Sequence, residues 1–384
     1  MTNIDRRTFV VGSTGIMAAA MHPASCSAAV NAKVLETRII SHLSHRYHGW
    51  PTLARRSNGE LLLVCSGGRE SHVCPFGRVE LMRSQDGGRT WSWPQTVIDG
   101  PIDDRDAGVV ETATGSILIT TFTSLAYENT LAAAEKEKRW EAPRLRRWKA
   151  AHQRVDDKQR KQSLGVWMIR STDGGLSFSQ PYRCQVNSPH GPLQLGNGKL
   201  LYAGKELWAE TSRIGVCTST NDGRSWGDFR AIPTRPGDDG SKYHELHAVE
   251  CSDGKLVAHI RNHNQANSGE TLQSESSDDG RTWSTPRAIG VWGLPSHLLR
   301  LRDGRLLMSY GHRRRPLGNQ ARVSTNGGQT WSQPLLISQD GASGDLGYPS
   351  TVELDDGTLV TIWYERLKSS PYAVLRQARW LLRS

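Results

Sequence analysis

The segment YHELHAVECSDGKLVAHIRNHN, residues 243–264, carries acid–base and cationic groups on both sides of a turn. Glu245 comes nine residues before Gly254, and Arg261 comes seven residues after it. Because an Asp-Gly turn between two apolar runs predicts a β-hairpin, both side chains are expected at the end opposite the turn. There the carboxylate could act as a base, and the guanidinium could bind an anionic group of a ligand.

The same arrangement recurs in six hairpins along the chain, each with a turn glycine between apolar runs. The turn glycines are Gly59, Gly115, Gly198, Gly254, Gly304 and Gly357. If the hairpins stand side by side, their far ends bring together Trp50 and Arg69, Asp106, His190 and Lys205, Glu245 and Arg261, His297 with Arg313, Arg314 and Arg315, and Tyr348 and Glu365. Acid, base, phenol and cations at one opening are typical of a ligand site.

A second repeat is the pattern Ser-x-Asp/Asn-x-Gly-x-Thr/Ser-aromatic. It occurs as SQDGGRTW from Ser84, STDGGLSF from Ser171, STNDGRSW from Ser219, SSDDGRTW from Ser276 and STNGGQTW from Ser324. In such a turn the acidic or amide side chain bonds nearby backbone and the aromatic ring packs beneath it. Five copies indicate a repeated structural unit.

The spacing of the repeats predicts the fold. Gaps between the turn glycines are 56, 83, 56, 50 and 53 residues, and the long gap holds a basic stretch at 126–163. That stretch is rich in helix formers, so we expect one or two helices inserted in the second repeat. We therefore predict an all-β, six-bladed β-propeller over residues 35–384 with a helical insertion in the second blade. The strand VLETRII, near the N-terminus, is expected to complete the last blade.

The N-terminus has the layout of an export signal. Arg6 and Arg7 precede an apolar run from Phe9 to Met21 and then small residues. We predict a twin-arginine-type signal peptide over residues 1–28, and hence an exported protein, periplasmic or extracellular. Lipid attachment at Cys26 is an alternative that the nearby proline disfavours. No later segment is apolar enough to span a membrane.

The net charge of +10 does not by itself indicate a nucleic-acid partner. Residues 126–163 hold 11 Lys and Arg against 6 Asp and Glu, without regularly interleaved aromatics, which favours a solvated helical face. We also expect no cofactor and no metal. His244 and His247 lack the spacing of a metalloprotease motif, and on a strand they point to opposite faces. The oligomeric state is left open.

The repeats resemble the Asp boxes of the sialidase (neuraminidase) superfamily. HELHAVECSDGKLVAHIR and DLGYPSTVELDDGTLVTIWYE resemble two active-site segments of that superfamily. By this resemblance Tyr348 is the nucleophile, Glu245 its partner, Arg261 a ligand of the substrate carboxylate and Glu365 a brace for arginines. Arg315 is favoured as a further arginine within the Arg-Arg-Arg run.

Two positions differ from the family pattern. Residues 49–51 read Gly-Trp-Pro where the family has Arg-Ile-Pro. The loop GGRESHVCPFG offers Glu70 and His72 where the family has its acid/base Asp. Asp106, at the start of the second hairpin, is a candidate substitute.

The predicted function is that of a sialidase-like exo-glycosidase acting on a terminal acidic sugar of a glycan, sialic acid or a related one. Such a sugar carries a carboxylate on its anomeric carbon, so a neutral phenol avoids the repulsion that an anionic nucleophile would meet. A phenol is a weak nucleophile at neutral pH and needs an adjacent base. A retaining mechanism with Tyr348 and Glu245 meets this need, with Arg69 and His190 as further candidate substrate contacts.

Two other functions remain open. A propeller polysaccharide lyase would use Tyr348 with a histidine such as His190 to remove the proton beside a uronate carboxylate. A non-catalytic glycan-binding propeller would need no nucleophile. In that case Glu245 and Arg261 form a structural salt bridge and the phenol only packs.

Overall fold

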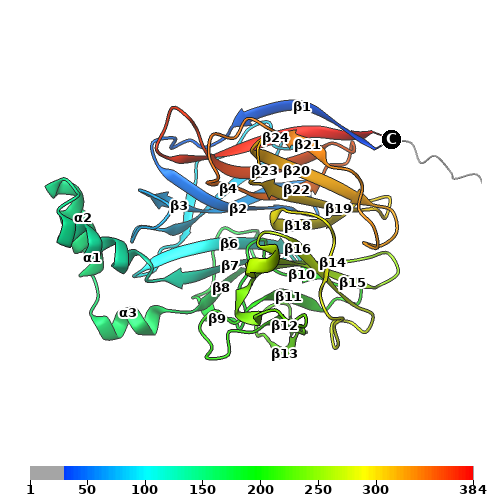
Figure 1. Ribbon diagram of the computed structural model, residues 1–384, viewed down its shortest axis with the longest axis horizontal. Coiled ribbons are helices and arrows are strands. Elements are labelled where there is room, and N and C mark those ends of the chain that lie inside the picture. The colour runs from blue at the N-terminus through cyan, green and yellow to red at the C-terminus, as the bar shows by residue number, and fades with distance from the viewer. Residues whose placement is uncertain (1–29, 384) are drawn as a thin grey trace, which may run out of the picture.

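The computed structural model describes residues 30–383, which form six four-stranded antiparallel sheets (Figure 1). The predicted signal peptide at 1–28, with Cys26, lies outside the described residues. Blades one to five are β2 (Tyr47–Arg55), β3 (Leu61–Arg69), β4 (Arg78–Ser84) and β5 (Gln95–Ile98); β6 (Asp103–Glu111), β7 (Ile117–Ser124), β8 (Val166–Ser171) and β9 (Tyr182–Arg183); β10 (Leu193–Gln194), β11 (Leu200–Lys205), β12 (Ile214–Ser219) and β13 (Gly227–Ala231); β14 (Tyr243–Glu250), β15 (Leu256–Asn262), β16 (Thr271–Ser276) and β17 (Arg287–Ala288); and β18 (Leu294–Arg300), β19 (Leu306–His312), β20 (Gly318–Ser324) and β21 (Leu335–Ser338). The predicted six-bladed propeller is confirmed.

The sixth blade joins the two ends of the described chain. It contains β22 (Leu346–Glu353), β23 (Leu359–Arg366), β24 (Ala373–Arg383) and, as its outer strand, β1 (Asn31–Ile39). Strand β1 pairs antiparallel with β24, and the two lie side by side in Figure 1. The prediction that VLETRII completes the last blade is therefore confirmed. Most β1 side chains are exposed, so the backbone ladder carries much of this attachment.

Neighbouring blades share apolar cores. Val64 and Leu81 of blade one pack in one cluster with Val109 and Ile119 of blade two, and all four side chains are buried. Because the middle strands are covered by sheets on both faces, they read as unbroken apolar runs such as Leu61–Val64 rather than as alternating patterns.

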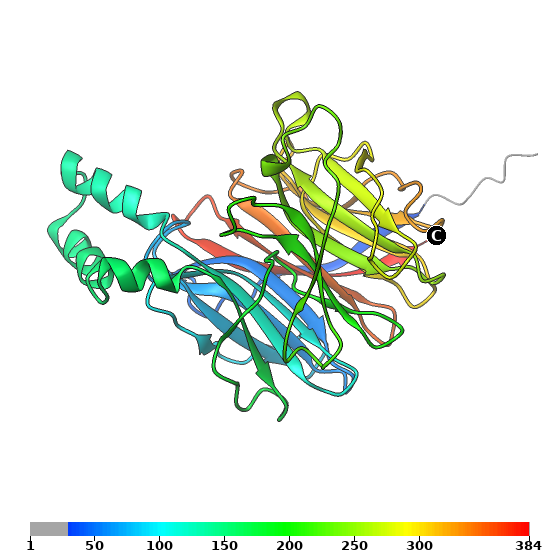
Figure 2. The same cartoon turned by 90° about the horizontal axis from the view of Figure 1, so that it is seen from below.

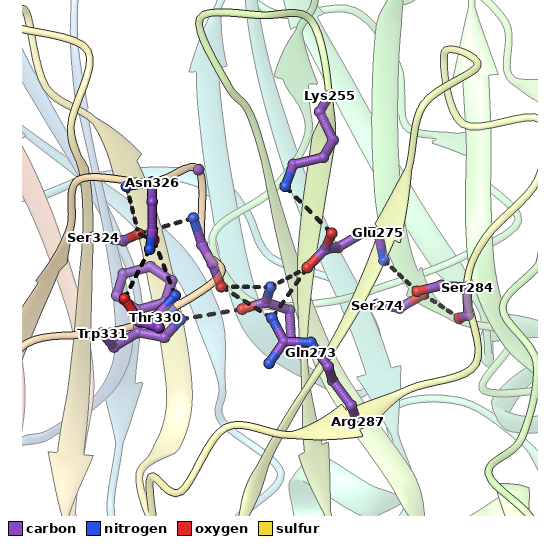
Figure 3. A network of polar contacts seen from close by, with 12 residues as sticks. Lys255, Gln273, Ser274, Glu275, Ser284, Arg287, Ser324, Asn326, Thr330 and Trp331 are labelled. Atoms are coloured by element: carbon purple, nitrogen blue, oxygen red, sulfur yellow. Dashed lines mark hydrogen bonds and ion pairs between the residues drawn. The ribbon is translucent and has the colours of Figure 1, made fainter. Parts of the chain in front are cut away.

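The Asp-box turns of blades one to five contact the preceding blade, as the fifth blade illustrates (Figure 3). Ser324 Oγ and Asn326 Oδ1 accept hydrogen bonds from backbone N–H groups of their own turn, at 2.9 and 3.0 Å. Trp331 Nε1 donates to Gln273 Oε1 of blade four at 3.1 Å. The equivalent indole of Trp91 donates to blade six at 2.9 Å, which adds a side-chain contact where the ring closes.

Three helices interrupt the second sheet of the chain. Helices α1 (Tyr127–Glu137), α2 (Ala142–His152) and α3 (Asp157–Ser163) lie between β7 and β8, and stand out to one side of the sheets (Figures 1 and 2). Three short helices form because Lys138 takes a left-handed conformation at the end of α1, and Asp156 opens α3 with a capping box. Two short 3₁₀ turns, η1 (Gly240–Lys242) and η2 (Gln265–Asn267), complete the elements. Among the described helices, none has the length and apolar character required to cross a bilayer.

The helices pack on the loop between β3 and β4. Tyr127 and Trp148 share a buried apolar cluster with Cys74 of that loop, and Phe76 packs against the same cluster. The rings of Phe76 and Trp148 meet edge to face, with centroids 6.1 Å apart. The inserted helices thus support a loop at the same end of blade one as Arg69.

Candidate active site

Five blades carry a non-glycine residue with a left-handed backbone near the start of the blade. These residues are Trp50 (φ 53°), Asp106 (φ 47°), His190 (φ 77°), Glu245 (φ 44°) and Tyr348 (φ 54°). In four of the five, the pairing of the first two strands shifts register at that place. Such a β-bulge re-aims a side chain and costs about 1–3 kcal/mol of backbone strain, which is characteristic of functional sites.

Tyr348, Glu245 and Arg261 meet at the centre of this arrangement. Tyr348 Oη donates to Glu245 Oε1 at 2.5 Å, and Arg261 Nη1 lies 2.5 Å from Glu245 Oε2. The same Nη1 donates to Tyr348 Oη at 3.1 Å, and Arg261 Nε donates to His263 Nε2 at 2.6 Å. Blades four and six therefore bring together the phenol, carboxylate and guanidinium that the sequence predicts at one end.

The protonation states of this triplet suit a nucleophile and its base. Burial opposes ionisation of Glu245, but the charge of Arg261 and the hydrogen bond from Tyr348 outweigh it and lower the pKa of Glu245. Burial and then the charge of Glu245 raise the pKa of Tyr348 well above its ordinary value. At neutral pH the phenol keeps its proton beside an ionised carboxylate, so Glu245 can accept that proton as the oxygen attacks.

Asp106 supplies a second carboxyl group close to Glu245. Burial, and next the charge of Glu245, raises the pKa of Asp106 to about 7, although Arg105 and Arg261 oppose the rise. The side chain is nearly inaccessible, with the residue 7% exposed. Two carboxyl groups in one buried region do not both ionise readily, so near neutral pH Asp106 holds a proton part of the time.

An aromatic layer lies beside these groups. The Tyr348 ring centroid is 5.7 Å from that of Tyr364 and 6.4 Å from that of Trp50. The guanidinium carbons of Arg105 and Arg69 lie 4.3 and 4.9 Å from the Trp50 ring centroid. Blade one therefore has an indole at its bulge position, with two guanidinium groups beside the Trp50 ring, and no cationic side chain at that position.

Arg69 is not available to a ligand. Its residue is 0% exposed, and its Nη1 and Nη2 groups bind Asp103 Oδ1 and Oδ2 at 2.5 and 2.9 Å. Ser66 Oγ and the backbone carbonyls of Asp104 and His72 take further donors. The predicted substrate contact of Arg69 is wrong on this geometry, because the carboxylate of the neighbouring blade already binds the guanidinium.

The structure places Arg313, not Arg315, beside the triplet. Arg313 Nε donates to the Leu346 carbonyl at 3.0 Å, and its charge helps to lower the pKa of Glu245. Arg315 lies farther beyond the end of β19 and is exposed. Sequence reasoning could not tell which of the three consecutive arginines faces the site, because the exact end of the strand was not known. The structure shows that it is Arg313, which directly follows the last residue of β19.

Glu365 lies outside the triplet. The residue is 1% exposed and accepts hydrogen bonds from Trp363 Nε1 at 2.7 Å and Arg376 Nη1 at 2.5 Å. It therefore braces Arg376 of β24. Within the described chain, the arginines near Tyr348 donate no hydrogen bond to it.

His190 points into a buried histidine cluster. Its ring centroid is 5.3 Å from that of His247 and 4.9 Å from that of His297, and both of its ring nitrogens lack a hydrogen-bond partner. Burial, and next the neighbouring His247, lowers the pKa of His190 well below its ordinary value. The structure thus places His190 among neutral rings, apart from the triplet. Within residues 30–383, no three His, Cys, Asp or Glu side chains have the arrangement of a metal site.

Comparisons with known proteins agree with this architecture. The family model of the BNR repeat-like domain matches residues 143–361. A search of curated proteins finds no match. A solved structure of a protein of unknown function from Dyadobacter fermentans is 21% identical and covers 92% of this chain and 100% of its own, with a TM-score of 0.72.

Two solved sialidase-type structures are also similar. The NanB sialidase from Streptococcus pneumoniae is 14% identical over 90% of this chain and 70% of its own, with a TM-score of 0.65. The intramolecular trans-sialidase from Ruminococcus gnavus, in complex with oseltamivir carboxylate, is 13% identical over 90% of this chain and 96% of its own, with a TM-score of 0.66. At these identities the likeness establishes the fold alone.

Proposed function

The chain belongs to the family of BNR repeat-like domains, and on that basis we propose that it is an exported, sialidase-like exo-glycosidase. It removes a terminal acidic sugar, sialic acid or a related one, from a glycan or glycoconjugate with retention of configuration. The observation that carries the proposal is the contact of Tyr348 Oη with Glu245 at 2.5 Å and with Arg261 at 3.1 Å. Export through the twin-arginine-type signal at residues 1–28 is part of the proposal.

In the proposed reaction Tyr348 Oη attacks the anomeric carbon and passes its proton to Glu245 Oε1. The leaving oxygen takes a proton from a general acid as its bond to the anomeric carbon breaks, and a covalent sugar–tyrosine intermediate forms. Water then attacks the same carbon and returns a proton to that group, while the phenol oxygen leaves and recovers its proton from Glu245. Asp106 is proposed as a catalytic carboxyl that holds a proton beside Glu245 and limits the negative charge there.

Two guanidinium groups support the choice of an acidic sugar. Arg261 Nη2 has no hydrogen-bond partner within the described chain, although its other nitrogens bind Glu245, Tyr348 and His263. Arg313 uses only its Nε, toward the Leu346 carbonyl. The remaining N–H groups suit a carboxylate, which arginine binds in a planar, bidentate manner.

The test is a screen of the purified mature protein against a panel of acidic glycans, with product anomers followed by NMR. We expect release of the terminal acidic sugar, with the retained anomer appearing first. Tyr348→Phe should bind the same glycan with similar affinity and lose turnover by at least about a thousandfold, which corresponds to about 4 kcal/mol of activation free energy. Near-normal turnover in Tyr348→Phe would remove the nucleophile assignment.

The other outcomes of the screen identify the alternatives. An ultraviolet-absorbing unsaturated uronate would indicate a lyase. Binding without turnover by the wild type would indicate a glycan-binding propeller. Either result contradicts the proposed hydrolysis.

A further inference from the structure

The loop between β3 and β4 places a histidine at the edge of the aromatic layer. The side chain of His72 is 49% exposed, and its ring meets Trp50 edge to face with centroids 5.0 Å apart. The Trp50 ring also meets the Tyr348 ring edge to face, with centroids 6.4 Å apart. His72 and the proposed nucleophile are therefore neighbours of the same indole ring, and the His72 side chain faces solvent.

The orientation of the His72 ring is fixed through one nitrogen. Nδ1 lies 3.1 Å from Asp345 Oδ1 and 2.8 Å from Tyr47 Oη. Tyr47 Oη donates its proton to Asp345 at 2.9 Å, and Tyr364 Oη donates to the same carboxylate at 3.2 Å. The hydroxyl proton of Tyr47 is used on Asp345, and the Asp345 carboxylate has no proton to donate. Both oxygens can therefore only accept from Nδ1, so Nδ1 is the N–H nitrogen of the neutral ring. Within residues 30–383, Nε2 has no protein partner and is free to exchange a proton.

Asp345 is suited to hold this tautomer. Burial favours its neutral form, but the hydrogen bond and charge of His72 and the hydrogen bonds from the two tyrosines lower the pKa of Asp345. An ionised carboxylate on Nδ1 fixes the ring and stabilises the imidazolium that forms when Nε2 takes a proton.

The loop is anchored on both sides of His72. Before it, Glu70 accepts a hydrogen bond from Trp148 Nε1 of α2 at 3.0 Å, and after it Cys74 is fully buried against the helices. The His72 carbonyl accepts from Arg69 Nη2 at 3.0 Å. The inserted helices and the buried Arg69 thus hold the loop in place.

A group that protonates a leaving oxygen must reach the solvent side of the sugar, where the remainder of the glycan extends. Asp106 is 7% exposed and lies near Glu245, whereas the His72 side chain is half exposed at the rim. We propose that His72 is the general acid and base of the reaction, with Asp345 and Tyr47 as positioning residues. This inference rests on the proposed function and names the group that completes it.

The proton transfers balance. In the first step the Nε2–H of the His72 imidazolium protonates the glycosidic oxygen as its bond to the anomeric carbon breaks, and Tyr348 Oη forms the new bond while Glu245 takes the phenol proton. In the second step neutral Nε2 takes a proton from the attacking water. The sugar–tyrosine bond breaks as the water oxygen bonds to the anomeric carbon, and the phenol recovers its proton from Glu245.

The test compares two leaving groups, a 4-nitrophenyl sialoside and sialyllactose. A nitrophenolate leaves without protonation, whereas the sugar alkoxide of sialyllactose needs an acid. For His72→Gln we expect kcat/KM on sialyllactose to fall by about 10²–10⁴-fold and on the nitrophenyl sialoside by less than about tenfold. The matched control is His45→Gln, another exposed histidine near blade one, which should leave both rates unchanged.

Two further variants separate the roles. Asp345→Asn and Tyr47→Phe should slow sialyllactose more than the nitrophenyl sialoside, because a merely structural defect would slow both substrates equally. Equal losses on both substrates in His72→Gln, or no loss, overturn the assignment. A leaving-group difference in Asp106→Asn but not in His72→Gln also overturns it. Absence of turnover by the wild type on every acidic glycan refutes the proposed function instead.

Discussion

The Glu245–Arg261 pair allows a stability and activity test in one experiment. Its side chains are 18% and 13% exposed, and removing one partner of a buried ion pair costs about 3–5 kcal/mol. Arg261→Met leaves Glu245 with its hydrogen bond from Tyr348, so we expect a loss near the lower limit, about 3 kcal/mol. Glu245→Gln leaves the guanidinium without a carboxylate, and we expect a loss of similar size.

The double variant Glu245→Gln/Arg261→Met gives the coupling between the two residues. Because neither charge is then left unpaired, its free energy of unfolding should recover by about 2–3 kcal/mol relative to the sum of the single losses. Urea unfolding followed by fluorescence measures all four proteins. The exposed pair Arg302–Asp355, with side chains 45% and 78% exposed, is the control, and its coupling should stay below about 1 kcal/mol.

Activity distinguishes a catalytic pair from a structural one. If both residues act in the reaction, the double variant stays as inactive on the acidic glycan as the single variants, although its stability recovers. Recovery of turnover together with stability would refute the catalytic assignment and leave a structural salt bridge. Additive stability losses in the double variant would refute the buried ion pair itself.

Three further predictions concern single residues. Because burial raises the pKa of Asp106 from its ordinary 3.8 to about 7, the folded chain holds a proton that the unfolded chain releases in this range, so stability falls as pH rises through it. Asp106→Asn should remove this fall. Measured at about pH 4.5 and about pH 8, the free energy of unfolding of the variant relative to that of the wild type should be higher at the higher pH. Arg69→Met leaves the buried Asp103 with only the longer contact of Arg105 at 3.9 Å, and calorimetry should show a loss of about 3 kcal/mol; a loss under about 1 kcal/mol contradicts the contacts described. Arg313→Ala should raise KM for acidic glycans by about tenfold or more with a smaller change in kcat, whereas an unchanged KM excludes a role in binding the carboxylate.

The propeller could be predicted from sequence because its signals are local and repeated. Each hairpin carries its own turn glycine, and each Asp box closes within eight residues, as SSDDGRTW from Ser276 does. The same local geometry placed Tyr348, Glu245 and Arg261 at one end, since opposite positions in a hairpin follow from counting outward from the turn.

The remaining details depend on contacts between distant segments. Whether Arg69 is free depends on Asp103 of the next blade, and the tautomer of His72 depends on Asp345, 273 residues later. The bulges are single-residue irregularities, and alternation of apolar and polar residues does not reveal them. No local pattern in the chain encodes these relations, so sequence reasoning could not choose between Glu70 and His72 and could not foresee that Arg69 is buried against Asp103.

The left-handed backbone position recurs at the same place in five blades, so each of these blades presents one side chain in the same way. The side chain at this position differs from blade to blade: it is an indole at Trp50, a carboxyl at Asp106 and Glu245, an imidazole at His190 and a phenol at Tyr348. Because the surrounding sheets hold this strained backbone conformation in place, a change of residue there alters the chemistry of the opening while the fold is kept. New substrate preferences can therefore arise, or be engineered, one blade at a time.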